Sequence, residues 1–240
     1  SWLPPLLNHF NSNSDTGILQ PHILDYNKPS HFEYAGAAGG YIDANGFPFC
    51  RGRIHSNIEK DFGQYDLPKE VFWASGACFF IRSKLFWNQN GFDDSFFAHQ
   101  EEIDLCWRVF NAGFKTMALG ASKVYHVGGA TLGTSPRKVF LNHRNSLLML
   151  TKNLPPEKFA WRIFRRLCWD GIIGIYYLFN LKFNFSLAII KAHFEFYSKF
   201  RFIKAKSNKS IKKENYFYTK NIILSFIKQK KLIFKDLNRE

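Results

Sequence analysis

The sequence lacks several features that would assign it quickly to a class. It has no Cys-x-x-Cys pair, so its thiols are expected to be buried in a reducing compartment rather than joined in disulfides. Its four cysteines are widely spaced: Cys50, Cys78, Cys106 and Cys168. The longest uncharged stretch of the apolar region near residue 180 covers only 11 residues, 171–181, which is too short to cross a bilayer. No secretory signal is expected at the start, because no basic segment precedes an apolar run.

Acidic residues are scarce in the last ninety positions. Residues 1–150 hold 13 Lys/Arg and 13 Asp/Glu, whereas residues 151–240 hold 20 and 6, so 20 − 6 accounts for the whole net charge of +14. A basic block of this kind suits an anionic membrane surface or a nucleic acid. No nucleic-acid-binding motif accompanies the charge, so nucleic acid is not expected as a partner.

What is present over the first 127 residues is an alternation of strand and helix patterns. The expected elements are strands over 17–24 and 71–82, a short helix from 83, a helix over 101–112, and strands over 115–119 and 122–127. Residues 33–53 are rich in glycine and are expected to form a long loop or a pair of short strands. The order strand, helix, strand indicates an α/β fold.

From about residue 138 the pattern becomes helical. Helices are expected over 139–153, over 157–169 and, with polar interruptions, over 172–190. The region 151–240 is basic and rich in aromatic residues, which is typical of helices that lie in a membrane interface. The tail from Lys204 is expected to be partly disordered. The sequence therefore predicts two parts, 1–150 as a catalytic and acceptor-side part and 151–240 as a basic helical appendage.

Acidic residues cluster where the helix over 101–112 begins. Glu101 and Glu102 are adjacent and Asp104 follows two positions on. Acidic residues are favoured at a helix N-terminus, and Asp104 could pair with Arg108 one turn on, so a purely structural role is one interpretation. The other is that a carboxylate here accepts a proton from a hydroxyl.

Four motifs in order give this cluster a context. They are Trp73-Ala74-Ser75-Gly76-Ala77 with Arg82, then Gly91-Phe92-Asp93, then Glu101-Glu102-Ile103-Asp104-Leu105-Cys106-Trp107-Arg108, then Val124-Tyr125-His126-Val127-Gly128-Gly129. Together they resemble family 2 glycosyltransferases, particularly the rhamnosyltransferase-like bacterial members, over roughly residues 1–150. The resemblance implies a GT-A-type fold and an inverting transfer of sugar from a nucleotide-sugar donor to a hydroxyl acceptor.

The resemblance also implies the catalytic residues. The second acidic residue of the pair, matching Glu102, is the general base in that family. This chain has Glu where the family pattern has Asp, so the choice between Glu101 and Glu102 stays open. Asp104 is a candidate for substrate contact, although with Arg108 it is more expected to hold the helix and a neighbouring loop.

Further roles follow only from the resemblance. His126 would help to hold a divalent cation, Mg²⁺ or Mn²⁺, on the donor pyrophosphate, although a lone histidine is more often structural. Gly76 and Ala77 would lie near the acceptor. Trp73 would either stack on a sugar or belong to the core. Arg144 would face a phosphate, or would be an ordinary arginine on a helix surface.

The family begins with a nucleotide-binding half that ends in an Asp-x-Asp strand, and no Asp-x-Asp precedes Trp2. The Rossmann-like half is therefore expected to be missing, and the chain is expected to be inactive alone. The implied products are cell-envelope or lipid-linked polysaccharides, made from a saccharide or lipid-linked acceptor at the inner face of a bacterial cytoplasmic membrane. The alternative is a membrane-associated scaffold or degenerate transferase without activity.

Overall fold

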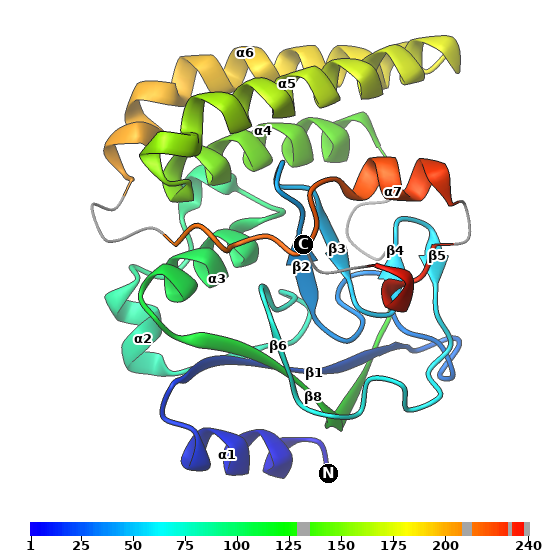
Figure 1. The fold of residues 1–240 in the computed structure, drawn as a ribbon, viewed down its shortest axis with the longest axis vertical. Helices are drawn as coiled ribbons and strands as arrows, with labels where there is room; N and C mark the ends of the chain where they lie inside the picture. Colours follow the sequence, from blue (N-terminus) through cyan, green and yellow to red (C-terminus); the bar gives the residue numbers. More distant parts are fainter. Residues whose placement is uncertain (129–134, 208–212, 230–231, 238–240) are drawn as a thin grey trace. The chain divides into compact units, whose positions relative to one another are not determined.

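The structure is a computed structural model that describes residues 1–128, 135–207, 213–229 and 232–237. Within these ranges the chain forms seven α-helices and two four-stranded sheets, so the mixed α/β class predicted from the sequence is confirmed (Figure 1). The chain forms two compact units, each discontinuous in sequence. Unit 1 comprises Ser1–Gly91, Leu105–Gly128 and Asn215–Glu240, and unit 2 comprises Phe92–Asp104 and Gly129–Glu214. These units do not follow the boundary expected at residue 150, and the functional division there stays a prediction.

The larger sheet of unit 1 has the strand order β6-β8-β1-β7. Its centre is β1 (Thr16–Asp25), parallel to β8 (Lys115–His126), and the two edges are the antiparallel β6 (Lys69–Val71) and β7 (Phe80–Ile81). The two strands predicted over 115–119 and 122–127 are one strand. A register shift, from Pro21 opposite Leu119 to His22 opposite Lys123, absorbs the residues between them.

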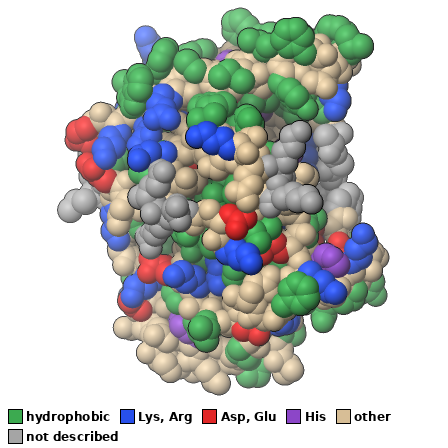
Figure 2. Space-filling view, turned by 45° about the vertical axis from the view of Figure 1, so that its right-hand side comes forward, with side chains coloured by type: hydrophobic (Ala, Val, Ile, Leu, Met, Phe, Trp, Pro, Cys, Tyr) green, Lys and Arg blue, Asp and Glu red, His purple; other side chains and the backbone are tan. Residues whose placement is uncertain are grey.

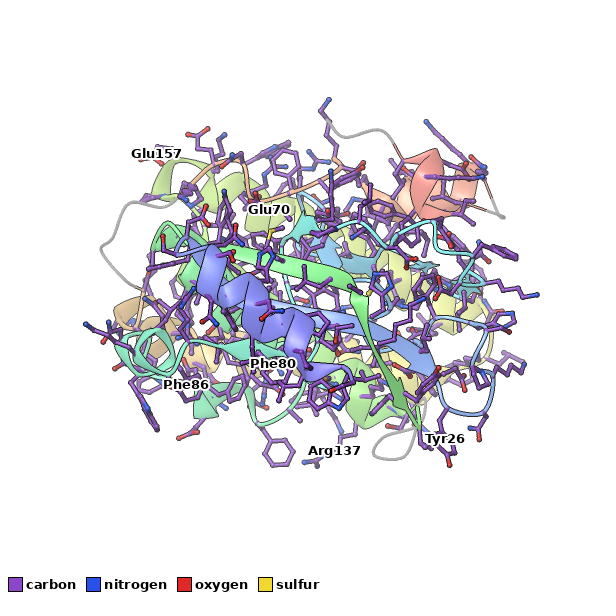
Figure 3. All side chains as sticks on the ribbon, turned by 90° about the horizontal axis from the view of Figure 1, so that it is seen from below. Tyr26, Glu70, Phe80, Phe86, Arg137 and Glu157 are labelled. Carbon is purple, nitrogen blue, oxygen red and sulfur yellow. The ribbon has the colours of Figure 1, made fainter. Side chains whose placement is uncertain are left out.

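Helix α1 (Leu3–Ser12) lies on one face of this sheet, as the view from below shows (Figure 3). Leu6 packs with Leu19 and Leu119, and Phe80 borders the same cluster. This helix was not predicted from the sequence. The start signal was present, because Pro4 and Pro5 occupy its second and third positions, where a backbone N–H has no intrahelical acceptor.

The strand predicted over 71–82 is wrong in its middle. The chain leaves β6 after Val71 and turns at Gly76 and Ala77 before β7 begins. The hydroxyl of Ser75 accepts a hydrogen bond from the Ala77 amide at 3.2 Å, and the Ser75 amide donates to Gln20 Oε1 at 2.7 Å. These bonds replace the ladder that a continuous strand would make, so the small residues form an exposed turn.

The smaller sheet of unit 1 is a run of short antiparallel strands followed, far along the chain, by the C-terminal segment. The strands are β2 (Gly40–Ile42), β3 (Pro48–Cys50), β4 (Arg53–Ile54) and β5 (Asn57–Ile58). Thr219 forms a β-bridge with Asp43, and the Phe234 ring stacks on Tyr41 with 5.4 Å between centroids. This segment includes α7 (Ile222–Lys228) and a short 3-10 helix (Phe234–Asp236). In the tail that was predicted to be partly disordered, residues 213–229 and 232–237 are described and the rest beyond Ser207 lies outside the described residues, so that prediction stays untested.

Unit 2 is dominated by three long helices that lie side by side: α4 (Pro136–Asn153), α5 (Pro156–Phe179) and α6 (Phe183–Ala205) (Figure 1). The sequence predicted a break near residue 170, but the break falls at Asn180–Lys182, where Leu181 has a φ of 55°. Asp170 continues the helix because its buried carboxylate has three partners. These are Arg166 Nε at 2.8 Å, His143 Nδ1 at 2.8 Å and His193 Nε2 at 3.1 Å. The chain thus buries a charge only by surrounding it with donors from all three helices.

The described part of the chain contains no helix that is both long enough and apolar enough to span a bilayer.

Candidate active site

The two candidate carboxylates open helix α3 (Glu101–Asn111), whose bounds agree with the helix predicted over 101–112. Oε2 of Glu101 and Oε2 of Glu102 are both shielded from solvent and have no hydrogen-bond partner among the described residues. Burial, reinforced by the neighbouring charge of Glu101, raises the pKa of Glu102 to about 7. Burial also raises the pKa of Glu101. A carboxyl with a pKa near neutrality, and with an unused oxygen, can accept a proton from a substrate hydroxyl.

The backbone that leads into these carboxylates is strained. Between the 3-10 turn η1 (Asp94–Phe96) and α3, three residues other than glycine have positive φ: Phe97 at 64°, His99 at 68° and Gln100 at 70°. Each such residue costs free energy, and the cost is tolerated only where the surroundings hold the backbone firmly. Strain of this kind immediately before two carboxylates, each with one oxygen that has no partner among the described residues, supports a functional role for the segment.

Helix α4 supplies the bonds that hold the strained segment. Asn145 Nδ2 donates to the carbonyl oxygens of Phe96 at 3.0 Å, Ala98 at 2.7 Å and His99 at 2.7 Å. Gln100 adds two side-chain bonds, donating to the Asn142 carbonyl at 3.1 Å and accepting from Ser146 Oγ at 3.0 Å. One face of α4 therefore fixes the backbone from which Glu101 and Glu102 project.

Arg144 also holds the strained segment, and we call the α4 side chains of Arg144, Asn145 and Ser146 the brace. Its guanidinium donates to the carbonyls of Ser95 and Phe96 at 3.3 and 2.8 Å, and it pairs with Glu195 at 2.7 Å. The residue is only 5% exposed, so the interpretation of an arginine on the helix surface is wrong. Its donors point at protein acceptors in this structure, and the predicted contact with a phosphate stays untested.

Asp104 lies one turn into α3 and is fully buried. It accepts from Lys152 Nζ and from Asn153 Nδ2, both at 2.8 Å. Lys152 also bonds Asp93 at 2.7 Å, and Lys206 reaches Asp93 at 2.8 Å. Burial alone would raise the pKa of Asp93, but the two ammonium groups hold it well below its usual range. Asp104 thus anchors the helix, as the sequence favoured, and a contact between Asp104 and substrate stays a prediction.

Arg108 also has the anchoring role expected of it. Its guanidinium donates to the carbonyl of Gly91 at 2.8 Å and to the carbonyl of Gln89. These carbonyls end α2 (Ser83–Asn88) and the turn after it, where Asn90 and Gly91 both have positive φ. The arginine of the third motif therefore fixes the turn that contains the glycine of the second.

The acceptor-side candidates of unit 1 differ from one another. Trp73 is 3% exposed, its Nε1 donates to the Tyr41 carbonyl at 2.9 Å, and its ring lies against Gly40 so closely that no β-carbon would fit there. Of the two interpretations of Trp73, the structure supports the core one, and stacking on a sugar is corrected. Gly76 and Ala77 are exposed in the turn after Ser75, where a ligand could reach their backbone.

His126 is the last residue of β8, and it lies beside Glu33, a contact that was not predicted from the sequence. Its Nδ1 lies 3.5 Å from Oε2 of Glu33, a carboxylate that is 2% exposed and accepts from the Ala35 amide at 2.5 Å. A β-carbon on Gly128 would lie 2.3 Å from Oε1 of Glu33, so the glycine of the fourth motif leaves room for this carboxylate. Gly129 of the same motif lies outside the described residues.

The side chains of His126 and Glu33 offer too few ligands for a divalent cation. One imidazole and one carboxylate are fewer than the three or more ligands that protein metal sites use, and no group of three His, Cys, Asp or Glu side chains within the described ranges could hold an ion. His126 and Glu33 therefore do not complete a cation site by themselves.

Comparison with known proteins adds one finding. The chain is 30% identical over 78 residues to the N-acetylglucosaminyl-diphospho-decaprenol L-rhamnosyltransferase of Mycobacterium tuberculosis, in strains CDC 1551 / Oshkosh and ATCC 25618 / H37Rv. The matched segment covers 32% of this chain and 25% of the relative. No family model matches the chain. The matched segment is thus similar to part of an enzyme that is named a glycosyltransferase.

Proposed function

We propose that this chain carries the acceptor-side part of an inverting, family 2 glycosyltransferase of the GT-A type. The observation that carries the proposal is the Glu102 carboxylate. Its Oε2 is shielded from solvent and has no hydrogen-bond partner among the described residues, its pKa is raised to about 7, and the segment before it is strained and held by α4. The similarity to a named rhamnosyltransferase over 78 residues supports the reaction class.

The chemistry is a single displacement. Glu102 accepts the proton of the acceptor hydroxyl as its oxygen attacks the anomeric carbon of the donor sugar. The nucleoside diphosphate leaves from the opposite face, so the configuration at that carbon inverts. Glu101 keeps the proton affinity of Glu102 high, because two adjacent carboxylates resist being charged together. A divalent cation, if bound, would supply neutralisation of charge on the leaving diphosphate.

The substrates are proposed by class. The donor is a nucleotide-sugar, and the acceptor is a saccharide carried on a lipid diphosphate, the class of molecule after which the relative is named. Synthesis of cell-envelope polysaccharide from such a carrier would take place at the inner face of a bacterial cytoplasmic membrane.

The stereochemistry of the product tests this proposal. The full-length protein would be incubated with a panel of sugar nucleotides and a lipid diphosphate acceptor, and the anomeric configuration of the product would be read by NMR. Inversion with Glu102-dependent turnover is expected. Retention of configuration would overturn the mechanism, and an absence of turnover with every donor would favour a non-catalytic scaffold.

Residues 1–240 alone are expected not to consume donor above the spontaneous rate, because they contain no Asp-x-Asp pair to complement His126 and Glu33. Robust turnover by these residues would contradict that expectation.

A further inference from the structure

Helices α5 and α6 each have a second apolar stripe that none of the described residues covers. On α5 the stripe recurs at intervals of three to eight residues, and on α6 at intervals of three or four, so each follows one side of its helix. We call these ten residues the apolar face: Trp161, Phe164, Ile172, Ile175, Phe179, Phe183, Leu187, Ile190, Phe194 and Tyr197. Every one is at least 46% exposed. Figure 2 shows hydrophobic side chains gathered over the part of the surface that these helices form.

The stripes are additional to the residues that hold the helices together. On α6, Ile189, Ala192, Phe196 and Ile203 are buried, and each exposed residue of the stripe lies to one side of that set. The turn between the helices is the most apolar part, with Phe179 at 84%, Leu181 at 77% and Phe183 at 60% exposure. A contiguous exposed apolar surface of this extent on a helix pair marks an interaction site.

The charges around the face identify what it contacts. Residues 156–205 contain nine Lys/Arg and three Asp/Glu, a difference of +6. Two of the three acids are already paired, Asp170 with Arg166 and Glu195 with Arg144 and Lys199. A second copy of the chain would bring two positive surfaces together, whereas an anionic bilayer would neutralise this one.

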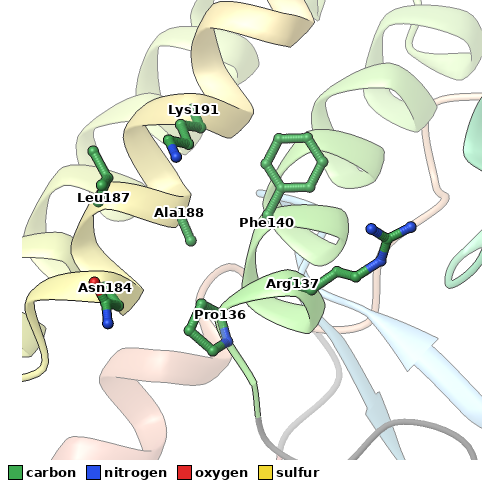
Figure 4. Close-up of a pocket in the computed structure, with 7 residues that line it drawn as sticks. All are labelled: Pro136, Arg137, Phe140, Asn184, Leu187, Ala188 and Lys191. Atoms are coloured by element: carbon green, nitrogen blue, oxygen red, sulfur yellow. The ribbon is translucent and has the colours of Figure 1, made fainter.

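A groove beside the apolar face also combines apolar and positively charged side chains. It lies between α4 and α6, where Phe140, Leu187 and Ala188 form an apolar lining and Arg137 and Lys191 stand at its sides (Figure 4). Leu187 belongs both to the groove and to the apolar face. Cations next to apolar area are the combination by which interfacial helices hold anionic lipid.

We propose that the apolar face of α5 and α6 is a membrane-docking surface. The helix pair lies on an anionic bilayer, its turn at Phe179–Phe183 enters the boundary between head groups and acyl chains, and the surrounding cations contact lipid phosphates. The proposal does not depend on glycosyl transfer, because it rests on exposure and charge alone.

The test is co-sedimentation of residues 1–240 with vesicles of phosphatidylcholine, alone or mixed with phosphatidylglycerol. The face variant is the triple substitution Phe179→Ser, Phe183→Ser and Phe194→Ser. Its matched control replaces three equally exposed side chains of unit 1: Phe62→Ser, Leu67→Ser and Trp87→Ser. Wild-type protein is expected to prefer the anionic vesicles. The face variant should bind them at least about tenfold more weakly than wild type, and the control should bind like wild type.

A charge variant supports the same test without touching any apolar residue. Lys182→Gln with Lys191→Gln is expected to weaken binding to anionic vesicles at least about threefold, whereas Lys28→Gln with Lys84→Gln leaves it unchanged. This pair decides the matter if the face variant melts at a lower temperature than wild type.

Three results would overturn the proposal. They are no binding of wild-type protein to either vesicle, equal loss in the face and control variants, and self-association in analytical ultracentrifugation that the face variant abolishes without any lipid binding. The last result would assign the face to a second copy of the chain.

Discussion

The two groups of candidate residues, one in each unit, are built to different degrees. In unit 2, Glu101 and Glu102 follow a segment whose backbone oxygens are held by Arg144 and Asn145. In unit 1, His126 is 39% exposed at its side chain and meets a single carboxylate at 3.5 Å. The surroundings of Glu101 and Glu102 are set by the chain's own residues. His126 and Glu33, by contrast, could supply only two of the ligands that a bound cation would need.

That contrast explains why the two groups should respond differently to substitution. A residue whose surroundings fix its geometry and proton affinity loses its function when it, or its support, is changed. A residue that contributes one donor among several is expected to change affinity more than maximal rate.

The largest effect is expected from the proposed base. In the full-length enzyme, Glu102→Gln should lower kcat by about 10²–10⁴-fold, because glutamine cannot accept the hydroxyl proton. Donor binding should change little, as equilibrium titration would show. If Glu101→Gln is the more damaging substitution, Glu101 is the base; if neither matters, the acidic residues serve only the helix N-terminus.

The second-largest effect is expected from Asn145 of the brace. Asn145→Ala removes the side-chain donor from the carbonyls of Ala98 and His99, while the Phe96 carbonyl keeps its bond from Arg144, so we expect a loss of about 2–4 kcal/mol in the free energy of unfolding. Turnover of the full-length enzyme should fall by about 10–100-fold through displacement of Glu102, while its KM for donor stays near wild type.

Asn142→Ala is the matched control for the brace, because Asn142 lies on the same helix and offers Gln100 its carbonyl rather than its side chain. A loss of stability in Asn145→Ala with an unchanged kcat would show that the brace supports the fold and not the base.

The smallest effect is expected at His126. If this residue helps to hold the cation implied by the resemblance, His126→Ala in the full-length enzyme shifts the dependence of rate on Mn²⁺ or Mg²⁺ to concentrations about threefold to tenfold higher. The maximal rate at saturating metal should stay within a few-fold of wild type. His31→Ala serves as the control in the same unit, and an unchanged metal dependence in His126→Ala would make His126 a structural residue.

Local signals in the sequence were sufficient for some of this molecule. The α3 helix and its acidic start were predicted because apolar spacing and Gly113, with a φ of 95°, are both local. The anchoring role of Arg108 was predicted as well. The bend at residues 72–79 was not, because it depends on Gln20, which is 55 residues from Ser75 in the chain.

The supporting residues of the site could not have been found from the sequence. Asn145 acts 46 to 49 positions away from the carbonyls that it holds, and Glu33 lies more than ninety positions from His126. Contacts at such separations follow from the tertiary arrangement and leave no pattern in a single sequence. The break at Asn180–Lys182 was misplaced for a related reason: burial of Asp170 inside a continuous helix depends on His143 and His193, which belong to other helices.

The central claim is that the chain itself sets the proton affinity of Glu102, and it can be tested without any substrate. Because the folded-state pKa of Glu102 is raised above its ordinary value of 4.5, the group's contribution to stability is complete below that value and is lost as pH rises through about 7. Glu102→Gln should therefore unfold like wild type at low pH and be about 1–3 kcal/mol more stable well above neutrality.

The most direct measurement is an NMR titration of ¹³C-labelled glutamate side chains in residues 1–240, with the Glu102 signal assigned by its loss in Glu102→Gln. We expect a midpoint near 7 for Glu102. The midpoint should fall when Glu101 is changed to Gln, because the charge of Glu101 contributes to the raised pKa of Glu102. A midpoint near the ordinary value of 4.5, unaffected by Glu101→Gln, would contradict the proposal that Glu102 is poised as a base.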